Sequence, residues 1–543
     1  GLEIPAAPSG GAQASAASGD QRINSFGLGG QISVRVGRLN QTRPIDGPAV
    51  HLGLGTKTTA DLVYIQWPNG VAQAEFDLPA DGEAVALQRL KGSCPWLFAD
   101  DGDGLRFVTD ILWRSPLGLR INAVDTAGVV QTRDWVNLRP DQLRPVNGRY
   151  ELAVTAELWE THFFDEMKLL VVDHPADVVP LVDERFAIPP PPLALQPLTD
   201  SEPIDAATDQ RGQDVTATIR DLDERYLDGF GIGTYQGIAP DHWVELDLGG
   251  AAGRLQAKGL GADGLVLLAQ GWIYPTDSSI NVAIGQGRTV APKPLAMQVQ
   301  EADGRWRTVG PALGFPAGKH KTLLIDLAGM DPAGGVAPRR VRLATNLEVY
   351  WDRLSLAARA PETQRQQTEL APTTADLSYR GFSVTSHFGT VERAPRSQPE
   401  VPDYSRLASL RPIWIDLGGN YTRFGDVRDL LAGTDDRYVI LNAGDQIRLS
   451  FPVPPSPPAG WTRSFVFISD GWEKDGDFNT AYGGTVLPLP SHDRPEYADP
   501  VIRGPATTLE ADPVFQRHPE DWQLYHTRHV LPQRWPNPLY ATP

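Results

Sequence analysis

Two octapeptides, Leu265-Val-Leu-Leu-Ala-Gln-Gly-Trp272 and Phe465-Val-Phe-Ile-Ser-Asp-Gly-Trp472, share one pattern. Each is an apolar run of strand length that ends in a Gly-Trp pair, which is typical of a buried β-strand. A second pair of segments, Trp243-Val-Glu-Leu-Asp-Leu-Gly249 and Trp414-Ile-Asp-Leu-Gly418, is also similar. Two related β-sandwiches explain both similarities, and so does chance resemblance between short strands.

The amino-acid composition favours β-structure over long helices. The 543 residues include 53 glycines and 48 prolines. Glycine costs backbone entropy in a helix and proline removes a hydrogen-bond donor, so both residues disfavour helices. At about 150 residues per domain, the chain is long enough for three or four domains. We therefore predict an all-β fold, with a small β module followed by tandem β-sandwich or jelly-roll domains.

Changes of pattern along the chain predict where these domains begin and end. Strand-like runs separated by turn residues mark domains, whereas Pro-rich or Gln/Thr-rich stretches mark linkers. In chain order we predict a flexible linker (1–24), a small β module (25–92), a β-sandwich (93–188), a Pro-rich linker with a charged segment (189–235), a jelly-roll domain (236–358), a linker (359–404), a second, related sandwich (405–495) and an extended Pro-rich, aromatic arm (496–543).

Charge and motif content exclude several classes of function. The net charge of −18 argues against a nucleic-acid partner, which requires a basic surface. The sequence contains no apolar run long enough for a transmembrane helix. Its single cysteine, Cys94, excludes an intrachain disulfide and a cysteine-based zinc site. The motifs of zinc proteases, P-loop proteins and serine hydrolases are missing, so we expect no enzyme of these classes.

Two acidic stretches that contain glycine are candidate calcium sites. Calcium takes six to eight oxygen ligands, which carboxylates and amides at alternate positions of a turn supply. The favoured explanation is a solvated acidic turn for the first stretch and a structural loop for the second. We expect no cofactor, and calcium is the alternative that these two stretches leave open. The candidate ligands are Asp100, Asp101 and Asp103 in the first stretch, and Asp470, Asp475, Asp477 and Asn479 in the second.

Aromatic residues next to acids suggest sugar binding, because a tryptophan ring stacks on a pyranose while carboxylates bind its hydroxyls. The candidate ligand-binding residues are Trp272, Tyr274 and Asp277 in one region, and Trp472 and Glu473 in the other. The region 236–358 has the strand pattern of a galactose-binding jelly roll. Paired acids also serve glycoside hydrolases. The alternative is that the tryptophans are buried structural residues.

Two stretches that contain histidine are weaker candidates for metal sites. His162 lies near Asp165 and Glu166, a combination that binds metals when a third ligand is supplied. The tail contains His526-Thr-Arg-His529, which we expect at the surface because prolines nearby disfavour a helix.

The segment 24–70 carries three ordered sequence blocks. They are Asn24-Ser-Phe-Gly-Leu-Gly-Gly30, then His51-Leu-Gly-Leu-Gly55, then a strand from Asp61 that ends in Trp67-Pro-Asn-Gly70. These blocks resemble the ASPIC/UnbV domain of the cartilage acidic protein family. Gly30 and Leu52 depart from the usual alanine and phenylalanine of that family.

The resemblance implies a cellular location and a type of function. The family is exported, to the periplasm, cell surface or extracellular space, and serves in adhesion, matrix or assembly, with no catalytic residues in this module. Its usual N-terminal β-propeller is missing here, so the chain resembles the part that follows the propeller. We expect a non-enzymatic exported bacterial scaffold that binds other protein subunits, or copies of itself, through its Pro-rich arms. The alternative is a carbohydrate-binding protein, associated with glycoside hydrolysis, that binds glycans through jelly-roll loops.

Overall fold

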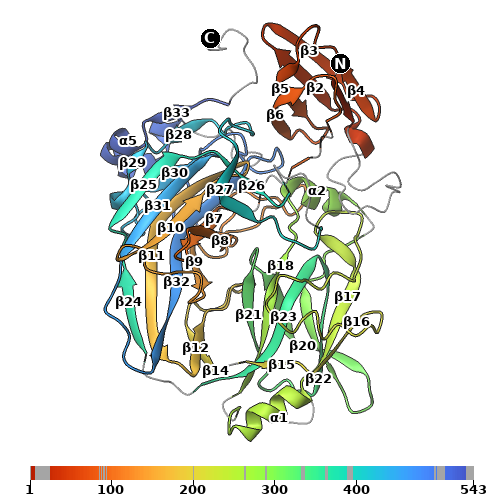
Figure 1. The fold of residues 1–543 in the computed structure, drawn as a ribbon, viewed down its shortest axis with the longest axis vertical. Coiled ribbons are helices and arrows are strands. Elements are labelled where there is room, and N and C mark those ends of the chain that lie inside the picture. Colours follow the sequence, from red (N-terminus) through yellow and green to blue (C-terminus); the bar gives the residue numbers. More distant parts are fainter. Residues whose placement is uncertain are drawn as a thin grey trace.

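Strands hold 46% of the residues and helices only 8%, which confirms the predicted all-β class. The computed structural model describes residues 2–5, 25–84, 86, 88–89, 92, 94–199, 201–261, 264–287, 290–331, 337–360, 365–387, 395–494, 497 and 508–532. They form two large β-sandwiches and one small module, which lies at the top right of Figure 1. No helix within these ranges is long and apolar enough to span a membrane.

The first sandwich, here called the split sandwich, is built from two distant stretches of sequence, 96–175 and 366–475. Its sheets have six strands in the order β29-β25-β31-β10-β7-β8, and four in the order β24-β11-β32-β9 with β30 paired to β11. The strands are β7 (Trp96–Asp100), β8 (Leu105–Asp110), β9 (Arg133–Leu138), β10 (Arg149–Thr155), β11 (Glu160–Pro175), β24 (Gln366–Leu370), β25 (Thr374–Tyr379), β29 (Gly425–Asp426), β30 (Val439–Leu441), β31 (Asp445–Pro452) and β32 (Trp461–Asp475).

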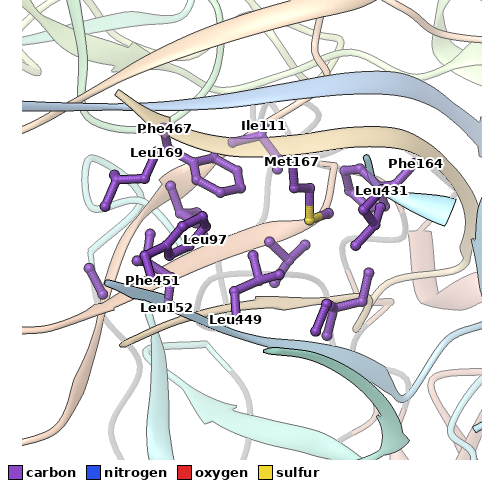
Figure 2. Close-up of a cluster of buried hydrophobic side chains, with 14 of the residues drawn as sticks. Leu97, Ile111, Leu152, Phe164, Met167, Leu169, Leu431, Leu449, Phe451 and Phe467 are labelled. Atoms are coloured by element: carbon purple, nitrogen blue, oxygen red, sulfur yellow. The ribbon is translucent and has the colours of Figure 1, made fainter. Parts of the chain in front are cut away.

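The core of the split sandwich lies between these two sheets. Figure 2 shows Leu152 and Phe451 of one sheet facing Leu169 and Phe467 of the other. Alternate residues of each strand point inward, which is the period of two that a strand imposes. The two parts of the sequence therefore contribute to one hydrophobic core.

The second sandwich, here called the inserted sandwich, is formed by residues 185–358. Its sheets have the orders β13-β20-β19-β22-β17-β16 and β15-β23-β18-β21. The elements are β13 (Arg185–Phe186), β15 (Glu202–Pro203), β16 (Ala206–Asp209), β17 (Ile238–Asp247), α1 (Gly249–Ala257), β18 (Leu265–Ile273), α2 (Ser278–Gln286), β19 (Leu295–Gln300), β20 (Trp306–Pro316), β21 (Lys321–Asp326), β22 (Arg340–Leu347) and β23 (Val349–Ala358).

This arrangement corrects the predicted domain boundaries. The segments 93–188 and 405–495 were predicted as separate sandwiches, but β10 pairs with β31 and β11 pairs with β32, so both segments share the same two sheets. The predicted linkers 189–235 and 359–404 also supply strands, among them β16 and β25. Sequence periodicity locates strands but does not specify which distant strand each one pairs with.

The Gly-Trp segments occupy equivalent positions in the two sandwiches. In each, the glycine faces a β-bulge in the neighbouring strand: Gly271 of β18 pairs with Trp351, and Gly471 of β32 pairs with Phe164. A Cβ on Gly271 would collide with the carbonyl oxygen of Tyr350, and one on Gly471 with that of Phe163. Both glycines are therefore required by a close backbone approach. The second similarity does not extend to structure, because Trp414 lies in a loop.

The small module packs on the split sandwich. Its main sheet has the order β3-β2-β5-β6, and β1 pairs with β4, so part of the predicted linker 1–24 is a strand. Its core includes Trp67 and reaches Trp159 and Trp414 of the split sandwich. The strands are β1 (Leu2–Pro5), β2 (Gln31–Val36), β3 (Leu39–Pro44), β4 (Ala49–Leu52), β5 (Thr59–Gln66) and β6 (Ala72–Pro79), and Ser25–Gly27 forms a short 3-10 turn, η1.

The C-terminal segment 508–532 is folded rather than extended, which corrects the predicted arm over this range. Val514 and Trp522 are buried against the split sandwich. The elements here are η3 (Leu509–Ala511), α4 (Pro513–Arg517), α5 (Pro519–Tyr525) and β33 (Arg528–Val530), which pairs with β28 (Gly419–Tyr421); the remaining elements are β12 (Val178–Leu181), β14 (Gln196–Thr199), β26 (Phe382–Thr385), β27 (Pro402–Ser409) and η2 (Arg428–Leu430).

Buried charged groups join the two sandwiches. Asp110, at the end of β8, lies 3.1 Å from the ammonium group of Lys319 and accepts a 2.7 Å hydrogen bond from its backbone N–H. The Lys321 ammonium donates to the carbonyl oxygen of Asp110 at 2.7 Å. All three side chains are buried. Since an unpaired buried charge is costly, this contact holds the sandwiches in one relative position.

We expect Gly271→Ala and Gly471→Ala to lower the free energy of unfolding by about 1–3 kcal/mol or more, because the added methyl group overlaps a carbonyl oxygen. Gly253→Ala is the matched control. Gly253 lies in α1 with open space around its Cα, so alanine should add about 0.5–1 kcal/mol through helix propensity. Urea unfolding of the three variants measures the effect; equal stabilities would contradict it.

We expect docking of the C-terminal segment to weaken in acid. Burial lowers the pKa of His526 to about 3, and the ring contacts the Thr422 hydroxyl at 3.0 Å. The unfolded histidine titrates near 6.5, so stability is complete above that pH and falls on the order of 4 kcal/mol as the pH approaches 3. Hydrogen exchange of 508–532 between pH 7 and 4 measures the loss. His526→Gln should flatten the profile, whereas His529→Gln, at an exposed position, should leave it unchanged.

Candidate functional site

A bulged strand pair forms the same structural frame in both sandwiches. In β11 the bulge leaves Asp165 without a partner residue on β32, and in β23 it leaves Asp352 without one on β18. Each aspartate follows two aromatic residues, Phe163 and Phe164 in one case and Tyr350 and Trp351 in the other. A bulge redirects the side chain of the extra residue, so both aspartates turn toward a neighbouring loop.

That loop is also shared. In the split sandwich it contains Asp435-Asp436-Arg437-Tyr438, and in the inserted sandwich it contains Asp223-Glu224-Arg225-Tyr226. The N–H of Asp436 donates to Asp165 at 2.9 Å, and the N–H of Glu224 donates to Asp352 at 3.1 Å. The repeated Asp-acid-Arg-Tyr pattern is the sequence signal that could have indicated this loop, although none of the predictions used it.

The two copies differ in how the bulged aspartate is satisfied. Both carboxylate oxygens of Asp352 accept backbone N–H groups, from Asp223 and Glu224. One oxygen of Asp165 accepts a hydrogen bond, whereas its Oδ1 is buried and has no hydrogen-bond partner among the described residues. Burial raises the pKa of Asp352 to about 6 and that of Asp165 to about 7. The bulge carboxylate of the split sandwich therefore accepts fewer hydrogen bonds than its equivalent in the inserted sandwich.

Neither candidate tryptophan is an open platform for a sugar, since both are about 2% exposed. The Trp272 ring stacks on Tyr350 at 4.9 Å, and its indole N–H donates to the Ser397 carbonyl oxygen at 3.0 Å. Trp472 packs against His492 at 4.5 Å. Both tryptophans are therefore buried structural residues, which was the alternative interpretation of the sequence.

The other predicted site residues near these tryptophans also contact protein groups. Asp277 caps α2 by accepting the N–H of Ile280 at 2.8 Å. Asp477 accepts the Ser279 hydroxyl at 2.9 Å and its N–H at 3.2 Å. The Asn479 side chain donates to the same hydroxyl at 2.9 Å. Tyr274, half-buried, lies 4.5 Å beneath the Arg396 guanidinium. Through Ser279, Asp477 and Asn479 join the end of the split sandwich to the start of α2 in the inserted sandwich.

The structure does not assemble the predicted calcium loops. Asp470 and Asp475 are five residues apart on one strand, which separates them by about 16 Å. Asp470 binds His492, whereas Asp475 lies near Glu160, its partner in the strand register. In the other stretch, the carboxylates of Asp100 and Asp101 accept N–H groups of their own turn, and Asp103 is exposed at its tip. This matches a solvated acidic turn.

Four ionisable residues meet on one face of the β11–β32 pair. Glu160 lies opposite Asp475, and His162 lies opposite Glu473, so the side chains share a face. All four are buried. His162 Nε2 is 3.1 Å from a Glu160 oxygen, while His162 Nδ1 and Glu473 Oε2 have no hydrogen-bond partner among the described residues. Register alone brings together two acidic stretches that the sequence separates by about 300 residues.

Electrostatics in this buried group favour a neutral Glu473. Burial, and then the nearby carboxylates of Glu160 and Asp475, raise the pKa of Glu473 well above its usual value. A protonated carboxyl beside other carboxylates is the arrangement that general acids use. The loop above it is close, since Cys94 N–H lies 3.4 Å from Glu160 and Gly92 has no room for a Cβ. The group is thus enclosed.

One set of metal-type ligands converges in the part of the chain that the structure describes. Asp165, Asp436 and His492 each place a ligand atom within 4.8 Å of the others. The sequence suggested Asp165 together with His162, but the bulge separates these residues into different clusters. Asp436 and His492 are distant in the sequence, so nothing in the local pattern connects them with Asp165.

Comparisons with known proteins returned no match: no family model, no curated protein and no solved structure resembles this chain. The resemblance of 24–70 to the ASPIC/UnbV domain therefore stays a prediction.

We expect Glu473→Gln to stabilise the protein at neutral pH. Because burial raises the folded-state pKa of Glu473, its contribution to stability is present below pH 4.5, the unfolded-state value, and is lost as the pH rises from there through the raised folded-state pKa. Glutamine removes this loss while keeping the shape. Asp477→Asn should instead cost about 1–3 kcal/mol, since one of its oxygens becomes a donor facing Ser279. Unfolding in urea at pH 5 and pH 8 measures both; equal effects of the two substitutions would contradict the assignment.

Proposed function

We propose that this chain is a non-enzymatic scaffold that binds other protein subunits or copies of itself outside the cytoplasm. One observation carries the proposal: residues of the kind that usually bind ligands are used here to join parts of the same chain. Trp272 binds the segment at Ser397, Asp477 binds α2 through Ser279, and Asp110 joins the sandwiches through Lys319. Such buried joints make a rigid body, which suits a component that positions partners.

The proposed location rests on the resemblance of residues 24–70 to an exported family.

Purification of the protein from its native source tests the proposal. We expect the chain to elute well above its mass of 59.2 kDa, in an assembly of defined composition, with its partners identified by mass spectrometry. Glycans with or without calcium should not change this elution. A monomer without partners would contradict the scaffold proposal.

A carbohydrate-active protein is the second candidate, and the carboxyl of Glu473 beside Glu160 and Asp475 is the observation in its favour. If a glycan panel reveals hydrolysis, Glu473→Gln should abolish it. Asp477→Asn is the matched control, because the Asp477 side chain accepts hydrogen bonds from Ser279, and its backbone N–H, which donates to Asp475, is unchanged by the substitution. Activity that survives Glu473→Gln would exclude this candidate.

A further inference from the structure

Three side chains from distant parts of the sequence meet at the bulge of β11. Asp165 comes from the bulge itself, Asp436 from the loop that precedes β30, and His492 from the segment that follows β32. His492 Nδ1 lies 2.6 Å from Asp436 Oδ1 and 3.6 Å from Asp165 Oδ2. Bonds of about 2.1 Å to a metal ion hold neighbouring ligand atoms about 3.4 Å apart, so the separation of His492 from Asp165 suits one ion, and the hydrogen bond from His492 to Asp436 lengthens by about 0.8 Å when the ion replaces its proton.

The unpartnered oxygen of Asp165 is the observation that points to a ligand. Asp165 is fully buried, and its Oδ1 has no hydrogen-bond partner among the described residues. A buried carboxylate oxygen without a partner is costly and rare. The equivalent Asp352 of the inserted sandwich uses both oxygens. In the inserted sandwich, the bulge thus holds an aspartate whose two oxygens both accept hydrogen bonds. In the split sandwich, one oxygen of the equivalent aspartate has no partner among the described residues.

The residues around this group resemble the outer shell of a metal site. His492 Nε2 donates to Asp470 Oδ1 at 2.8 Å, which orients the ring as carboxylates do for metal-binding histidines. The Asp436 Oδ2 atom accepts the Ser491 hydroxyl at 2.8 Å and Arg517 at 2.9 Å. In the inserted sandwich, Gln270 stands where Asp470 stands here.

We propose that Asp165, Asp436 and His492 bind one divalent transition-metal ion, with Zn²⁺ favoured over Mn²⁺ and Ca²⁺. One imidazole nitrogen with carboxylate oxygens is a zinc ligand set, whereas calcium prefers six to eight oxygens. The ion takes the place of the Nδ1 proton, which leaves to solvent, while the Nε2 proton stays on the hydrogen bond to Asp470. The bound ion links the β11 bulge to the segment at Ser491, and through Arg517 to α4.

Metal titration of the full chain tests this inference. After chelation and dialysis, Zn²⁺, Mn²⁺ or Ca²⁺ is titrated alone and followed by calorimetry, with bound metal counted by elemental analysis. We expect one saturable Zn²⁺ site per chain, and affinity in the order Zn²⁺, Mn²⁺, Ca²⁺.

The variants make the assignment specific. Asp165→Asn keeps an acceptor for the Asp436 N–H, so the fold should be retained while Zn²⁺ affinity falls at least tenfold. His492→Gln should have the same effect. Asp303→Asn, at an exposed ion pair with Arg305 in the other sandwich, should change nothing. The inference is overturned if no saturable site exists, if Ca²⁺ binds more tightly than Zn²⁺, or if either site variant binds Zn²⁺ normally.

Discussion

The antiparallel pairing of β11 with β32 organises the whole molecule. These long strands run side by side from Glu160–Asp475 to Pro175–Trp461, although almost 300 residues separate them in the sequence. They carry the buried acids on one face and the bulge aspartate on the other. The entropic cost of closing a loop grows only with the logarithm of its length. A whole sandwich can therefore be inserted between the two strands.

Buried polar contacts help to set the position of the inserted sandwich. Asp110 with Lys319 and Lys321 is one contact, and Asp477 with Ser279 is another. Such groups are costly to bury unless every partner is present, so they disfavour other orientations of the two bodies. This is the physical basis for a rigid scaffold, and it explains why candidate ligand residues are found inside the molecule.

The bulge frame occurs twice, but its two copies carry different chemistry. Both contain a strand with a Gly-Trp pair, a tyrosine edge against the tryptophan and an aspartate in the bulge. The inserted copy satisfies its aspartate with backbone N–H groups alone. The split copy replaces Gln270 by Asp470 and adds His492, which concentrates charge around Asp165. A common frame with one altered copy is how a structural unit can acquire a binding site.

The all-β class, the buried strands that carry Trp272 and Trp472, and the alternative that both rings are structural could all be predicted from the sequence. These features depend on local properties: side-chain period, glycine and proline content, and apolar runs. Other features emerge only in the folded chain. Segments 93–188 and 405–495 share one sandwich, Asp470 lies far from Asp475, and Asp165 meets Asp436 and His492. Strand register and bulges make these contacts, and a shift of one residue moves a side chain to the opposite face. Such long-range pairing leaves no periodic signal in the chain.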